Sequence, residues 1–79
     1  MELQERIMKC IRMVKGNDFN ATNQLITGGY LDSMDIISLI AKFEDEFEIL
    51  IPMDEADPDY FNSFTSIEAL IKRNGGDKQ

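Results

Sequence analysis

Ser33 is the side chain whose type and position best fit a chemical role, because it lies beside Asp32 at the expected start of a helix. The pair Gly28-Gly29 leads out of a loop, Asp32 or Ser33 supplies an N-cap oxygen, and an apolar-periodic run follows over residues 34–47. Unpaired N–H groups and the positive end of the helix dipole meet at such a position, which suits a phosphate ester. The alternative is that Ser33 only caps the helix.

Other chemistry is limited because the 79-residue sequence contains no histidine. It therefore has no Ser-His or Cys-His nucleophile pair and no imidazole that could bind a metal. The single Cys10 excludes an internal disulfide, suits a reducing cytosol, and falls on an apolar helix stripe where a small core residue is expected. We predict a cytoplasmic protein that is not an enzyme and has no metal site.

The charge of the chain is strongly acidic, with 15 Asp and Glu against 8 Lys and Arg and a net charge of −7. Nucleic acids are poor partners because phosphate binding needs positive charge, whereas basic protein surfaces are favoured. No segment is long and apolar enough to span a membrane, and the start Met1-Glu2-Leu3 lacks the basic region of a signal peptide. We expect a single domain over residues 1–75, with a frayed tail over residues 76–79.

The spacing of apolar residues predicts an all-α fold. Stripes at intervals of three and four residues indicate amphipathic helices over residues 2–15 and 34–48. Residues 16–32 between them form a long connection, whose apolar side chains should pin it across the helix ends.

Two further helices are predicted from their capping residues. Asp57 is the predicted N-cap of a short helix over residues 58–61, and Pro58 is its first residue. Thr65 and Glu68 form a predicted capping box for a last helix, which should stop at residues 74–75.

The helix over residues 34–48 projects into two apolar zones. The wider zone is assigned to the core, and it contains Ile36, Leu39, Ile40, Phe43 and Phe47. The second zone lies on the side of Ser33 and is bordered by acids, which favours a docking surface for partner proteins over burial of the whole helix. This predicted docking surface consists of Met34, Asp35, Ile37, Ala41, Glu44, Asp45 and Glu48.

The run Leu31-Asp32-Ser33-Met34-Asp35 resembles the Asp-Ser-Leu motif of acyl and peptidyl carrier proteins, with Met34 in place of a leucine of similar volume. The resemblance extends over essentially the whole chain. It includes the run Glu44-Asp45-Glu46-Phe47, the Ile51-Pro52 turn, the short helix at Pro58 and the capped last helix. It implies a four-helix bundle of acyl-carrier type, with three longer helices, a short third helix and a long first loop.

The resemblance also implies a carrier without catalytic residues of its own. A phosphopantetheinyl transferase would attach 4′-phosphopantetheine from coenzyme A to Ser33, with Asp32 supporting the transfer and its magnesium. The thiol of the arm would hold acyl groups as thioesters, and the other partners would be acyl-loading and acyl-using enzymes with basic docking surfaces. We expect such a carrier to be a monomer. A cleft that shields the acyl chain could be lined by Ile36, Ile40, Phe43, Phe61 and Ile67, although a core role alone explains them.

The cargo is left open by the resemblance. An acyl carrier of a fatty-acid, polyketide or related lipid pathway is the first reading. Ser38 and Ala41, however, depart from the commonest pattern of fatty-acid carriers. Residues 61–67 and the Asp-Ser-Met motif instead resemble those of stand-alone D-alanyl or aminoacyl carriers. Outside this family, the alternatives are an unmodified helical interaction domain and a calcium sensor. The acidic run over residues 54–57 lacks the spacing of an EF-hand loop.

Overall fold

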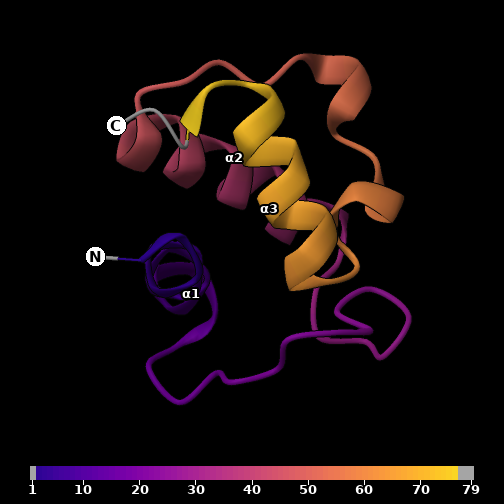
Figure 1. Cartoon of the computed structure of the whole chain (residues 1–79). Helices are drawn as coiled ribbons and strands as arrows, with labels where there is room; N and C mark the ends of the chain where they lie inside the picture. Colours follow the sequence, from indigo (N-terminus) through magenta and orange to yellow (C-terminus); the bar gives the residue numbers. More distant parts are fainter. Residues whose placement is uncertain (1, 77–79) are drawn as a thin grey trace.

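Every regular element among residues 2–76, which the computed structural model describes, is helical (Figure 1). The α-helices are α1 (Leu3–Lys15), α2 (Ser33–Phe47) and α3 (Phe64–Arg73), and two single 3₁₀ turns, η1 (Met53–Glu55) and η2 (Pro58–Phe61), lie between α2 and α3. The predicted all-α class is confirmed. The helix count differs, because the predicted short third helix, η2, has four residues and forms a 3₁₀ turn.

The two long helices predicted from periodicity begin and end within one residue of their expected bounds. Helix α1 packs against both α2 and α3, and α2 and α3 also contact η2. Figure 1 shows α1 nearly end-on, with α2 passing behind α3. The apolar stripe of α1 faces this interior, and its residues Ile7, Cys10 and Ile11 are buried.

The core is built around three phenylalanines that are fully buried, Phe43 and Phe47 of α2 and Phe61 of η2. The rings of Phe43 and Phe61 stack with their centroids 6.5 Å apart. Burial of side chains of this kind contributes roughly 1.5–3 kcal/mol each. The residues around them are Ile7, Cys10, Ile11, Leu25, Leu31, Ile36, Leu39, Ile49, Ile51, Phe64, Ile67, Leu70 and Ile71.

The long connection between α1 and α2 is fixed to the end of η2. The side chain of Leu25 is fully buried, and its N–H donates to the carbonyl oxygen of Asn62 at 2.8 Å. The side-chain oxygen of Asn62 accepts from the N–H of Ile26 at 2.8 Å. The carbonyl of Leu25 in turn accepts from the N–H groups of Tyr30 and Leu31. The prediction that apolar residues pin this connection is confirmed for Leu25 and Leu31, which are both buried, and the pinned segment ends at the start of α2.

The predicted capping box at the start of α3 is wrong by two residues. Ser63 is the N-cap, its side chain accepts from the N–H of Ser66, and the Ser66 side chain completes the box. Thr65 lies inside the helix, and the Glu68 carboxylate accepts from the Gln4 side chain at 2.9 Å. The earlier start puts Phe64 on the buried face of α3, which explains why this register is adopted.

The end of the described chain is packed against the core. Gly76 is buried, and a Cβ atom there would lie 2.2 Å from the Ile71 side chain, so only glycine fits without movement. The rest of the predicted frayed tail, residues 77–79, lies outside the described residues. None of the described helices combines the length and apolar character needed to cross a bilayer.

Candidate functional site

The first turn of α2 is closed by a capping box between Asp32 and Asp35. Gly29 supplies a positive φ of 83°, and the chain then reaches Asp32 in an extended conformation. Oδ1 of Asp32 accepts from the N–H of Asp35 at 3.0 Å, and Oδ2 of Asp35 accepts from the N–H of Asp32 at 3.1 Å. Of the two N-cap residues that the sequence allowed, Asp32 is therefore the one used. Such a cap contributes about 1 kcal/mol to helix stability.

Ser33 is the first residue of α2 and its side chain is exposed. Because Asp32 performs the capping, the Ser33 hydroxyl is not needed for it. Among residues 2–76 neither this hydroxyl nor the N–H groups of Ser33 and Met34 have a hydrogen-bond partner within the chain. An oxygen at this position is accessible to another protein and lies beside free amides at the positive end of the helix dipole.

Lys15, the last residue of α1, contacts the cap from the neighbouring helix. Its Nζ lies 2.9 Å from Oδ2 of Asp35, the same oxygen that accepts from the Asp32 N–H. Burial alone would raise the pKa of Asp35. The hydrogen bonds from Lys15 and from the Asp32 N–H outweigh this and hold the pKa below its usual value of 3.8. Sequence analysis did not select Lys15, because its partner lies on another helix.

The predicted docking surface divides into two groups of side chains. Its apolar members are open to solvent, since Met34 and Ile37 are 72% and 62% exposed and Ala41 is also exposed. Asp45 is exposed in the last turn of the same helix, and Glu48, which is the left-handed C-cap after Phe47 and not part of the helix, is also exposed. Met34, Ile37, Ala41 and Asp45 follow one another at intervals of three or four residues, so they share one outer face of α2, which begins directly beside Ser33.

The other two acids of the predicted docking surface are half-buried and bonded within the chain. Asp35 accepts from Lys15 and Asp32, as described above. Oε2 of Glu44 accepts from the N–H of Ile51 at 3.0 Å and so holds the segment that follows α2. Both carboxylates stabilise the fold in this position.

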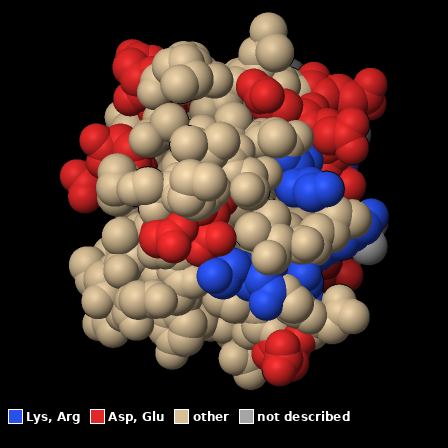
Figure 2. All heavy atoms as spheres, turned by 180° about the vertical axis from the view of Figure 1, so that it is seen from behind, with Lys and Arg blue, Asp and Glu red and all other residues tan. Residues whose placement is uncertain are grey.

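Basic residues are concentrated on one helix of this acidic protein. Four of the eight lysines and arginines lie on α1: Arg6, Lys9, Arg12 and Lys15. Figure 2 shows Lys and Arg gathered in one region of the face seen from behind, with acidic side chains around its margins. The acidic side chains around that region on this face are complementary in charge to a basic surface.

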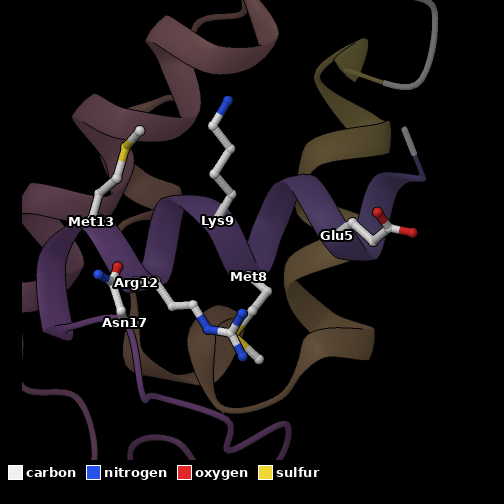
Figure 3. A pocket seen from close by; sticks show the side chains of 6 residues that line it. All are labelled: Glu5, Met8, Lys9, Arg12, Met13 and Asn17. Atoms are coloured by element: carbon white, nitrogen blue, oxygen red, sulfur yellow. The ribbon is translucent and has the colours of Figure 1, made fainter.

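The five residues of the predicted acyl cleft lie in the core. Ile36, Phe43, Phe61 and Ile67 are buried, and Ile40 is half-buried beside them. A hollow of about 500 Å³ lies elsewhere, on the outer face of α1. Figure 3 shows its lining side chains projecting from α1 and the residues after it; they are Glu5, Met8, Lys9, Arg12, Met13 and Asn17.

The acidic run after α2 is engaged with α3. Glu55 accepts from the Asn74 side chain at 3.0 Å and lies 3.3 Å from Arg73, while Asp57 caps η2. Within the described part of the chain, no three Asp, Glu, Cys or His side chains gather as a metal site would require.

A small all-helical domain with an exposed serine behind an acidic cap at the start of its second helix has the features of a carrier protein. Comparison with known proteins supports this class. The chain is similar to a D-alanyl carrier protein of Lactobacillus delbrueckii subsp. bulgaricus, with 25% identity over 92% of this chain and 94% of the relative. It is also similar to aminoacyl carrier protein 2 of Bradyrhizobium diazoefficiens, with 29% identity over 90% of this chain and 84% of the relative.

These relatives support a carrier-protein family, and the resemblance recognised from the sequence is confirmed. Both are named for carrying a group, which agrees with the prediction that this chain is not an enzyme. No family model matches the chain. No solved structure matches it either.

Proposed function

We propose that the protein carries aminoacyl or acyl groups as thioesters on a 4′-phosphopantetheine arm attached to Ser33. The observation that carries the proposal is the exposed Ser33 hydroxyl at the first position of α2, which the Asp32 cap leaves unused. The fold proposed with it is the acyl-carrier bundle, in which η2 takes the place of the short third helix.

The modification would be a phosphoryl transfer from coenzyme A. The Ser33 oxygen would form a bond to the phosphorus that bears pantetheine, and the anhydride bond of the pyrophosphate would break. Adenosine 3′,5′-bisphosphate would leave, and the hydroxyl proton would pass to the transferase. The chain itself contributes an accessible oxygen and two free amides near the phosphodiester, at the positive end of the helix dipole.

Asp32 is proposed to support this transfer in addition to capping α2. Among residues 2–76, only one of its carboxylate oxygens, Oδ1, accepts a hydrogen bond, and the residue is exposed. The second oxygen would be available to a magnesium ion held by the transferase, since carboxylates are favoured ligands of that ion.

The outer face of α2 is the proposed docking surface for the transferase and for loading and using enzymes. Met34, Ile37 and Ala41 would supply its apolar centre, and Asp45 and Glu48 would attract a basic rim on the partner. Asp35 and Glu44 would contribute to docking by holding α2 and its neighbouring segments in place, since both are hydrogen-bonded within the chain.

The proposed cargo is an amino acid such as D-alanine rather than a long acyl chain. The names of the two relatives favour this choice. The residues of the predicted acyl cleft, including the stacked Phe43 and Phe61, form core contacts that a small cargo leaves undisturbed. A fatty-acid or polyketide cargo is the alternative outcome of the cargo test below.

The experiment for attachment is incubation of the protein with coenzyme A, magnesium and a broad-specificity phosphopantetheinyl transferase, followed by intact-protein mass spectrometry. One phosphopantetheine should be added to the wild type and none to Ser33→Ala. Ser38→Ala is the matched control, because Ser38 is also an exposed serine of α2, and it should be modified like the wild type. Failure of the wild type with several transferases would leave an unmodified helical interaction domain as the better reading.

The cargo is tested on protein isolated from its native cell. Mass spectrometry of the thioester should find an aminoacyl group that hydroxylamine releases. A fatty acyl group in its place would refute the aminoacyl assignment and leave attachment at Ser33 intact.

A further inference from the structure

The ion pair between Lys15 and Asp35 joins the end of α1 to the turn that presents Ser33. Nζ of Lys15 lies 2.9 Å from Oδ2 of Asp35, and the side chains are 30% and 17% exposed. The same oxygen accepts the N–H of Asp32, the residue immediately before Ser33. One carboxylate oxygen therefore links the ammonium group of α1 to the backbone on which Ser33 is held.

The charge balance around Ser33 gives this contact a second effect. Asp32 and Asp35 place two carboxylates within two residues of Ser33, on a chain whose net charge is −7. A reacting pyrophosphate would meet unfavourable charge there, which opposes the favourable end of the helix dipole. The ammonium group of Lys15 offsets the charge of Asp35 at short range, where screening by salt is weakest.

We propose that Lys15 is a positioning residue for modification of Ser33, acting through Asp35 on the cap and on the local charge. The inference rests on the proposed function, because it names a determinant of that same reaction. Lys15 has no part in the chemical step. Its role is to keep Asp35 bonded to the Asp32 N–H and to reduce repulsion of an anionic group that approaches the hydroxyl.

The same two helices carry a second clamp that provides a control. Nε of Arg6 lies 2.9 Å from Oε2 of Glu46, its Nη2 donates to the Glu46 carbonyl at 2.8 Å, and the guanidinium lies over the Phe47 ring. Glu46 is thirteen positions after Ser33, about 20 Å along the helix axis. Loss of this clamp weakens the contact between α1 and α2 without touching the cap.

The test measures initial rates of transfer from coenzyme A over a range of carrier concentrations. Lys15→Met should raise the KM for the carrier by about three- to tenfold, as expected for loss of a partly buried charged hydrogen bond, with a smaller change in kcat. Lys15→Arg keeps the charge and the donor, so it should restore most of the lost kcat/KM. In Lys15→Met the uncompensated Asp35 carboxylate repels the approaching pyrophosphate over a longer distance, which salt does screen, so the difference from the wild type should shrink at high salt.

Two controls separate this role from general effects. Arg6→Met should lower the melting temperature and leave kcat/KM unchanged. Lys9→Met removes one positive charge from the same helix, at a side chain whose nearest acid is 3.6 Å away, and should also leave kcat/KM unchanged. If Lys15→Met does not fold, Asp35→Asn provides the second variant, since its amide oxygen can still accept from the Asp32 N–H without the charge.

A wild-type rate for folded Lys15→Met would overturn the positioning role, as would an equal loss in Arg6→Met. Either result leaves attachment at Ser33 standing, because the wild type is then modified. Absence of any modification of the wild type would refute the proposed function and, with it, this inference.

Discussion

Replacement of Asp32 by alanine is expected to destabilise the protein by loss of one half of the capping box. The variant keeps the backbone N–H that donates to Asp35, but it loses the Oδ1 acceptor that holds the Asp35 N–H at 3.0 Å. The expected loss is therefore that of a single N-cap, about 1 kcal/mol. For a domain of this size, such a loss lowers the melting temperature by about 4–8 °C.

The asparagine variant separates the cap of Asp32 from its proposed role in transfer. Asparagine is as good an N-cap as aspartate, so Asp32→Asn should unfold within about 0.5 kcal/mol of the wild type. It has no carboxylate for magnesium, however, so its modification at Ser33 should be slower. Thermal unfolding followed by far-UV circular dichroism measures the first effect, and transfer from coenzyme A measures the second.

The two outcomes test two separate statements. A melting temperature of Asp32→Ala equal to that of the wild type would show that the capping box does not stabilise α2 in solution. A wild-type transfer rate for Asp32→Asn would rule out the proposed part of the carboxylate in the reaction, and the cap would be unaffected by that result.

Three further predictions concern charge and core packing. The hydrogen bond from Arg6 holds the pKa of Glu46 in the folded protein below its usual 4.5. The stability that this carboxylate contributes is therefore present above pH 4.5 and is lost as the pH falls through the pKa of the folded state. The melting temperature of Glu46→Gln should lie below that of the wild type at pH 7, and the difference should close under acid conditions. Burial, with a smaller effect of Glu46, raises the pKa of Cys10 from 9.0 to about 11, so a thiol reagent at neutral pH should label the native protein far more slowly than the protein in denaturant. Phe43→Ala empties a fully buried site against Phe61 and should cost about 3–5 kcal/mol in denaturant titrations, enough to unfold much of so small a domain.

The helices of this protein could be predicted well because their signals are local. Apolar residues at intervals of three and four residues determined α1 and α2 to within one residue. The start of α2 could be predicted from two signals, the glycine pair that precedes it and the aspartate next to a serine at its first turn. The prediction that Ser33 carries the modification rests on the same short run of residues.

The start of α3 was misread because two capping patterns overlap there. Thr65 and Glu68 match the preferred capping box, whereas Ser63 and Ser66 form the one that is used. Local preference was outweighed by packing, since the earlier start buries Phe64 and lets its N–H donate to the Thr22 carbonyl at 2.9 Å. The partner, Thr22, lies in the long connection, and no local pattern could reveal it.

Contacts between helices could not be predicted either, because they join residues that are far apart in the sequence. Periodicity assigns a residue to a face of its own helix, but it does not give the angle at which two helices cross. Asp35 and Glu44 both lie near the exposed side of α2 and were assigned to the docking surface, while Lys15 and the Ile51 N–H reach them from other segments. A basic residue at the end of α1 was the available signal for Lys15, and it fits the helix dipole equally well.

The distribution of charges between α1 and α2 explains how the apolar side chains of the docking surface can stay exposed beside Ser33 without causing self-association. Arg6 and Lys15 of α1 pair with Glu46 and Asp35, so the acids on the α1 side of α2 take part in folding. The outer side carries the exposed acid Asp45, and the exposed Glu48 after its end, together with Met34 and Ile37 at 72% and 62% exposure. Large exposed apolar side chains invite self-association, but like charges beside them repel a second copy of the same surface. A partner with a basic rim is attracted by the same acids that repel a second copy. The docking surface that we propose on α2 requires this preference for basic partners over self-association.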